Sequence, residues 1–171
     1  MFEGATLPKP AGEAQRATLD VRWKQQREKA LANRVALVSC VKSKRTLESL
    51  ARDLYTSPLF VGMRRYAEQH ADAWFVLSAE YGVVSPDQLV ATYEKTLNKM
   101  MKADRLEWAK RVQQQLLTVL VPGTKVIILA GKRYREGIVP FLRGEGFSVE
   151  VPMEGLGIGS QLSWLNRHAH K

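Results

Sequence analysis

The chain has 171 residues, 45% of them hydrophobic, with 26 Lys and Arg against 17 Asp and Glu and a formal net charge of +9. This length and composition suit one globular domain. No apolar run approaches the roughly 18 residues of a membrane-spanning helix, which argues against a membrane protein. The lone cysteine excludes an internal disulfide, and the polar N-terminus carries no secretory segment, so we expect a cytoplasmic protein.

The positive charge favours polyanionic partners, namely nucleic acid or nucleotides, and ranks a membrane surface last. A basic surface that serves only solubility is the plain alternative. The oligomeric state stays open.

Two segments precede the first predicted strand. Residues 1–17 are rich in Gly and Pro and are typical of a flexible arm. Residues 18–171 are expected to form a single α/β domain. It begins with a helix over residues 19–33, whose basic face is either solvated or turned toward a polyanion; this face carries Arg22, Lys24, Arg27 and Lys29.

Four short apolar runs rich in β-branched residues predict strands that are covered on both faces, since none alternates cleanly between polar and apolar residues. They are residues 34–40, 73–78, 124–130 and 147–151.

Helical patterns lie between these strands. Ser57 followed by Pro58 has the form of an N-cap and first helical residue, and Asp104 with Glu107 resembles a capping box. Alternating strands and helices imply right-handed crossovers. We therefore predict an α/β three-layer sandwich with a short, mostly parallel sheet of about four strands flanked by helices. The expected helices cover residues 58–71, 106–120, 134–143 and 161–168.

Polar residues follow each predicted strand, where open α/β sheets bind ligands. After the first strand come Ser39, Cys40, Lys42 and Lys44. Hydroxyls and cations in one turn predict an anion-binding or nucleotide-binding site, with a basic solvated loop as the equal alternative. Cys40 is either an activated nucleophile or, more often for a lone cysteine, a small buried residue.

After the second strand come Ser78, Glu80, Tyr81 and Gly82. Glu80 is a candidate general base or an acceptor for a hydroxyl group of the ligand, unless it pairs with a nearby lysine. Tyr81 either stacks on a base or fills the core.

Glycines mark the ends of the last two strands. Gly131 permits close approach of a ligand to the backbone and precedes Tyr134. Gly155, Gly157 and Gly159 precede a predicted helix and are candidates to cradle a phosphate. The glycine pattern does not match the dinucleotide fingerprint, because no strand follows it.

No metal site or cofactor is expected. His70, His168 and His170 do not have the spacing of metal ligands, and the single cysteine makes a zinc site improbable.

The stretch from Leu77 to Leu97 resembles the signature of bacterial YaaA-type peroxide-stress proteins. The span from Val35 to Leu165 is more similar to a small bacterial and phage family of unknown function that is distantly similar to them. The resemblance implies an α/β fold over residues 34–165 and an association with DNA or nucleotide chemistry. Three elements carry the family resemblance: Ser39, Cys40 and Lys42 with Asp53, Leu54, Tyr55, Ser57, Pro58 and Phe60; Ala130, Gly131 and Tyr134; and Pro152, Gly155, Ile158 and Gly159.

Taken together, these residues predict an enzyme that acts on a nucleotide, nucleoside or nucleic-acid base, by cleavage or transfer at the N-glycosidic bond. Glu80, or otherwise Asp53, is the candidate catalytic carboxylate, and Lys42 and Lys44 would hold phosphate. Stacking on the base falls to Tyr55 or Tyr81.

The main alternative is a non-catalytic DNA-binding or other nucleic-acid-binding protein of stress or phage DNA metabolism, which the +9 charge favours. A structural or partner-binding protein is a third alternative.

Overall fold

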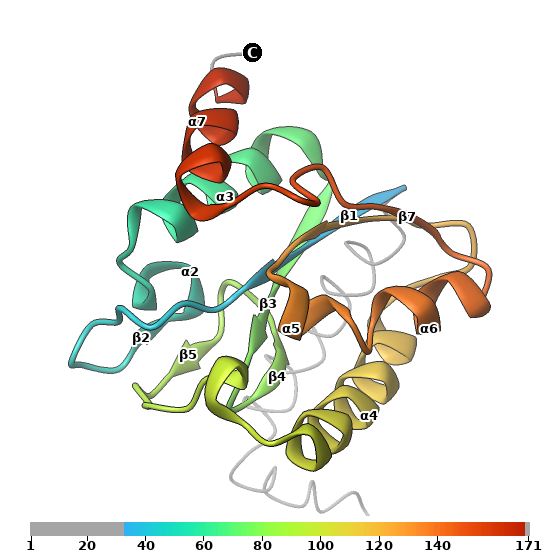
Figure 1. The fold of residues 1–171 in the computed structure, drawn as a ribbon, viewed down its shortest axis with the longest axis horizontal. Helices are drawn as coiled ribbons and strands as arrows, with labels where there is room; N and C mark the ends of the chain where they lie inside the picture. The colour runs from blue at the N-terminus through green and yellow to red at the C-terminus, as the bar shows by residue number, and fades with distance from the viewer. Residues whose placement is uncertain (1–32, 170–171) are drawn as a thin grey trace, which may run out of the picture.

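The computed structural model of the protein describes residues 33–169 (Figure 1). Three predictions lie outside the described residues. They are the arm over residues 1–17, the basic helix predicted over residues 19–33 (all but its last residue), and the role of His170. None of the helices within residues 33–169 combines the length and apolarity needed to cross a membrane.

A five-stranded sheet forms the middle layer, in the order β4–β3–β1–β6–β7. Its strands are β1 (Arg34–Ser39), β3 (Ala73–Ser78), β4 (Gly82–Val84), β6 (Lys125–Leu129) and β7 (Ser148–Glu150). The strands β3, β1, β6 and β7 run parallel, and β4 pairs antiparallel with β3. The predicted fold class and all four predicted strands are confirmed.

Helices cover both faces of this sheet (Figure 1). On one face, α3 (Pro58–His70) packs against β1 and against α7 (Ile158–His168). On the other face lie α4 (Lys102–Val119) and α6 (Val139–Gly144). The shorter elements are α2 (Ala51–Leu54), η1 (Leu97–Lys99), α5 (Lys132–Arg135) and the small β2–β5 sheet made of Ser49–Leu50 and Leu89–Val90.

The hydrophobic core explains why β1 and β3 read as unbroken apolar runs. Residues 35–38 of β1 are fully buried, because β1 is the middle strand and has a helix layer on each side. Burial on both faces removes the alternation that a half-exposed strand would show.

Two of the predicted helices need correction, and one predicted helix cap is confirmed. The helix predicted over residues 106–120, with Asp104 as its cap, begins at Lys102 and has Met101 as its N-cap, since the N–H of Arg105 bonds the carbonyl of Met101 at 3.0 Å. The single helix predicted over residues 134–143 is two helices, because the intervening Gly137 packs against Ala109 of α4 and its carbonyl accepts a 2.8 Å bond from the Gln113 side chain. The N-cap at Ser57 is confirmed, with its hydroxyl 3.1 Å from the N–H of Phe60.

The strand β4 was not predicted, because its three residues are too few for a periodic pattern. It depends on Gln115 of α4, whose side-chain oxygen accepts from the N–H of Val83 at 2.8 Å. Gly82 starts the strand at φ +75°, which favours glycine.

Gly82→Ala is expected to lower the free energy of unfolding by about 2–4 kcal/mol. Alanine is strained in the left-handed backbone conformation of Gly82, and its methyl group would displace the Gln115 side chain from its bond with Val83. An added Cβ would overlap the Gln115 side-chain oxygen. Gly123→Ala is the control, because Gly123 has φ +88° but no atom within 4 Å of an added Cβ, so only the backbone cost remains. Urea unfolding of both variants measures the difference, and equal losses would show that Gln115 does not brace this strand.

Candidate functional site at the carboxyl edge of the sheet

The sheet order creates one place where neighbouring loops diverge. After β1 the chain crosses toward β3, whereas after β6 it crosses toward β7 on the opposite side of β1. In open α/β sheets such a switch point leaves a crevice at the carboxyl ends of the two strands. Cys40, which follows β1, and Tyr134 in α5, which follows β6, meet here with thiol and phenol 3.2 Å apart.

The thiol of Cys40 is held among hydrogen-bond donors and is only 5% exposed. The N–H of Cys40 bonds the carbonyl of Leu77 at 2.9 Å, which continues the pairing of β1 with β3 past the strand end. The N–H of Ala79 points to the sulfur at 3.4 Å, and the N–H of Leu97 reaches the Tyr134 hydroxyl at 3.4 Å. Loops after β1, β3 and β6 and the start of η1 therefore converge on one thiol–phenol pair.

Ser78, the last residue of β3, links the next part of the site. Its hydroxyl donates to the Tyr93 hydroxyl at 2.9 Å and accepts from the N–H groups of Glu80 and Tyr81 at 3.2 and 3.0 Å. Its carbonyl accepts from the indole N–H of Trp108 at 2.9 Å. This fully buried serine thus ties the β3–β4 turn to α4 and to the loop after β5.

A pair of tyrosines, Tyr55 and Tyr93, extends this network toward the loop after β1. The hydroxyls of Tyr55 and Tyr93 are 2.6 Å apart, and the Tyr55 ring packs on Phe60. The ammonium of Lys44 lies 4.5 Å from the centre of the Tyr93 ring and donates to the carbonyl of Lys42 at 3.1 Å. A cation is therefore placed over the phenol face beside the hydroxyl network.

Burial lowers the pKa of Lys44, while the nearby Cys40 and Glu94 act in the opposite direction. Lys44 is half-buried, so protein replaces part of the water around its ammonium. An ammonium in this setting gains more from an anionic ligand than one in bulk water.

Burial also raises the pKa of Tyr55, Tyr93 and Tyr134, and a negative charge on Cys40 would raise it further. The three phenols therefore stay protonated and serve as hydrogen-bond donors and acceptors rather than as bases.

These raised pKa values predict that the free energy of unfolding falls above pH 10. The unfolded chain releases phenol protons near the ordinary pKa of 10.0, whereas the folded chain retains them. Each buried phenol then removes about 1.4 kcal/mol per pH unit, while the lowered pKa of Lys44 acts in the opposite sense up to 10.5. Denaturant unfolding across alkaline pH, with phenolate absorbance recorded in parallel, measures this. In Tyr93→Phe the free energy of unfolding should fall less steeply with pH. Ionisation of all five tyrosines while the protein is still folded would show that the pKa values of the buried phenols are not raised.

Several predicted site residues meet in this network, and others lie apart. Glu80 joins through its backbone, and its half-exposed carboxylate faces Lys95 at 4.0 Å. Asp53 is engaged elsewhere, since Arg64 holds its carboxylate at 2.9 Å. Tyr81 packs edge-on against Tyr93 with its hydroxyl donating to Ala91. The predicted residues that meet at the crevice or its network are Ser78, Cys40, Tyr134, Tyr55 and Lys44, with Ser39 buried at the end of β1.

The remaining predicted residues border the site or lie away from it. Lys42 is exposed in the loop after β1, Gly82 starts β4, and Gly131 is the N-cap of α5. The glycines after β7 lie beyond the edge strand of the sheet, on the approach to α7. They are Gly155, Gly157 and Gly159, all exposed.

Sequence reasoning missed Tyr93 and Trp108. Tyr93 lies within residues 77–97, and the expected resemblance of this stretch to a known signature was the available signal. Trp108 was hidden within the apolar stripe of α4 and carries no separate signal. Within residues 33–169, no group of three His, Cys, Asp or Glu side chains is placed to hold a metal ion.

Comparison with known proteins places this geometry in context. Residues 35–167 match the model of a family of unknown function, DUF6884. The uncharacterized protein YfjM of Bacillus subtilis (strain 168) is 32% identical over 123 residues, which cover 68% of this chain and 78% of YfjM. No solved structure matches the chain.

Proposed function

We propose that this chain, which belongs to the DUF6884 family of unknown function, is an enzyme that acts on a nucleotide, nucleoside or nucleic-acid base at the carboxyl edge of its sheet. The reaction that we propose is cleavage or transfer at the N-glycosidic bond between base and sugar.

The observation that carries the proposal is the junction of Cys40 and Tyr134 at the carboxyl ends of β1 and β6, with the Ser78–Tyr93 hydroxyls and the Lys44 ammonium beside it. A thiol and three phenols form a largely buried, donor-rich network. The half-buried Lys44 and Tyr81 at its margin suit an anionic, hydroxyl-bearing ligand. Burial of this many polar groups costs free energy of folding, and such groups are more typical of a functional site than of a hydrophobic core.

The available side chains suggest a role for each part of a nucleotide. Lys44, with the exposed Lys42 near it, would attract the anionic ligand to this edge of the sheet. Of the two candidate carboxylates, Glu80 is better placed than Asp53, because Glu80 lies at the end of β3 with a side chain 42% exposed, whereas Asp53 is neutralised by Arg64. Glu80 would take a proton from the attacking water as the C–N bond breaks and its electron pair leaves with the base.

Of the two candidate tyrosines, we assign stacking on the nucleic-acid base to Tyr81. Tyr55 is 3% exposed and packs between Phe60 and Tyr93, which leaves no free ring face for a base. Tyr81 is only half-buried, beside Glu80. The resemblance of residues 77–97 to the YaaA-type signature gives separate support for DNA or nucleotide chemistry.

The second candidate is a non-catalytic nucleic-acid-binding protein, which the net charge of +9 favours. Incubation of the purified protein with a panel of nucleotides and short single-stranded DNA, with assay of released base, separates the two. The enzyme proposal expects multiple turnovers on at least one member of the panel. Binding without base release, with an affinity that falls steeply as salt rises, would replace it with the second candidate.

A further inference from the structure

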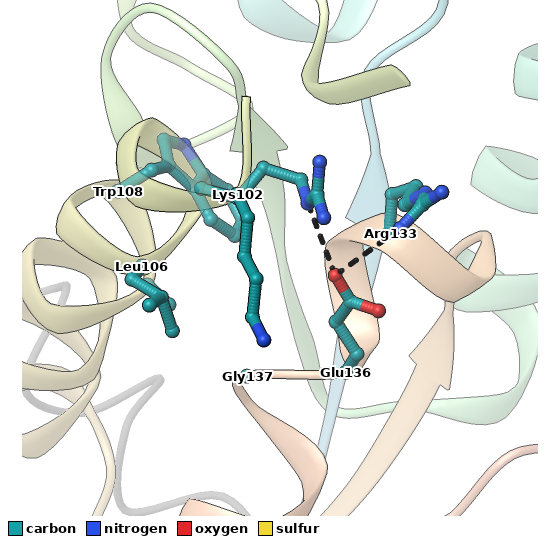
Figure 2. A pocket seen from close by; sticks show the side chains of 8 residues that line it. Lys102, Leu106, Trp108, Arg133, Glu136 and Gly137 are labelled. Atoms are coloured by element: carbon teal, nitrogen blue, oxygen red, sulfur yellow. Dashed lines mark hydrogen bonds and ion pairs between the residues drawn. The ribbon is translucent and has the colours of Figure 1, made fainter. Parts of the chain in front are cut away.

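A cavity of about 440 Å³ lies between the first turns of α4 and the link from α5 to α6. Figure 2 shows Lys102, Leu106 and Trp108 of α4 on one side and Arg133, Glu136 and Gly137 on the other. The volume falls within the range of about 300–1,000 Å³ that small-molecule sites occupy.

Positive charge exceeds negative charge around this cavity. Three cations, Lys102, Arg105 and Arg133, face the single carboxylate of Glu136. Glu136 is shared, since Arg105 lies 3.1 Å and Arg133 4.0 Å from the same oxygen. Lys102 has no ion-pair partner within residues 33–169, and its side chain extends across the cavity toward Gly137 (Figure 2).

The arrangement of these cations suits a phosphate group. A guanidinium presents paired donors that match phosphate oxygens, and a second cation beside it adds charge. The cavity also borders the start of α4, an 18-residue helix whose N-cap, Met101, makes no side-chain capping bond. The helix dipole therefore adds to the attraction that the side chains exert on an anion.

The cavity shares a wall with the candidate active site. Trp108 lines it, donates its indole N–H to the carbonyl of Ser78, and packs edge-on against the Tyr134 ring with centroids 5.7 Å apart. Arg133 directly precedes Tyr134 in α5. A ligand in the cavity therefore lies against the residues that position the thiol–phenol pair.

We propose that this cavity binds a phosphate group of the substrate, so that the substrate is a nucleotide or a nucleic-acid strand rather than a free nucleoside or base. This inference rests on the proposed function and specifies its substrate class. Arg105 acts here as a positioning residue, since it also donates to the carbonyl of Met100 at 2.7 Å and holds Glu136 in place.

The test is an NMR titration of the full chain with inorganic phosphate, a 5′-mononucleotide, the matching nucleoside and a short single-stranded DNA. We expect the Trp108 indole signal to shift with the phosphate-bearing probes, with the nucleoside binding much more weakly than the nucleotide. The double variant Lys102→Ala/Arg133→Ala should weaken nucleotide binding about tenfold or more. Lys110→Ala is the control, because Lys110 lies on the same helix, is exposed and pairs only with Glu107 in the part of the chain that the structure describes.

The possible results test the phosphate site and the enzyme proposal separately. Equal affinities in the double variant and the Lys110 control, or equal binding of nucleoside and nucleotide, would overturn the phosphate site even if the protein releases base. Weaker binding in the double variant without any base release would support the phosphate site and count against the enzyme. Binding of the oligonucleotide but not the mononucleotide would identify a nucleic-acid strand as the source of the phosphate.

Discussion

Glu80→Gln is expected to lower the rate of base release about 100-fold or more and to leave the fold unchanged. A positioned general base contributes about 10²–10⁴-fold to such reactions, and glutamine keeps the shape of glutamate without its ability to take a proton. The Glu80 side chain is 42% exposed and its ion pair with Lys95 is long, at 4.0 Å, so little stability depends on the charge. Turnover and thermal unfolding measured on the same preparation separate the two effects.

Glu107→Gln is the matched control for this experiment. Glu107 is an exposed glutamate on α4 that pairs with Lys110 alone among the described residues. It should keep full turnover. If Glu80→Gln also kept full turnover, Glu80 would not be the base, and the same assay on Asp53→Asn would decide whether the other predicted carboxylate serves instead.

Ser78→Ala is expected to lower the free energy of unfolding by about 2–4 kcal/mol, a large cost for the loss of one oxygen atom. The hydroxyl accepts two backbone N–H groups, those of Glu80 and Tyr81, and donates to Tyr93. Because Ser78 is fully buried, water cannot replace these bonds. Denaturant unfolding gives the free energy, and loss of activity should accompany it because the β3–β4 turn that carries Glu80 loses its anchor.

Ser85→Ala provides the comparison. The Ser85 hydroxyl accepts one bond, from the N–H of Asp87 at 3.4 Å, in a half-buried turn, so its removal should cost less than about 1 kcal/mol. A Ser78 variant no less stable than the Ser85 variant would mean that the Ser78 hydroxyl is not the link that holds the site together.

The sheet was predictable because three of its four parallel strands, β1, β3 and β6, are nearly continuous apolar runs, the pattern of strands that are buried on both faces. The boundaries of α4 and the break at Gly137 were not, because they depend on contacts between distant segments. Gly137 interrupts the helical pattern where it packs against Ala109. No residue near Gly137 in the sequence indicates that Ala109 will be its neighbour in the fold. The strand β4 likewise depends on Gln115, which lies 32 residues away from its partner Val83.

The candidate site was predictable to the extent that strand ends determine it. Cys40, Ser78 and Tyr134 each follow or end a parallel strand, so the topology brings them together. Tyr93 and Trp108 come from a loop and a helix face, whose paths no local pattern specifies. Their roles follow from the hydroxyl and indole bonds to Ser78, which only the folded chain shows.

We propose that this protein holds its ligand at the carboxyl edge of the sheet, where β1 and β6 end. A crystal structure of the protein soaked with a 5′-mononucleotide tests it most directly. We expect the sugar and base against Glu80 and Tyr81, over the buried Cys40–Tyr134 pair, with Lys102 and Arg133 on the phosphate. A nucleotide bound on another face of the molecule, with the carboxyl edge of the sheet unoccupied, would contradict the proposal.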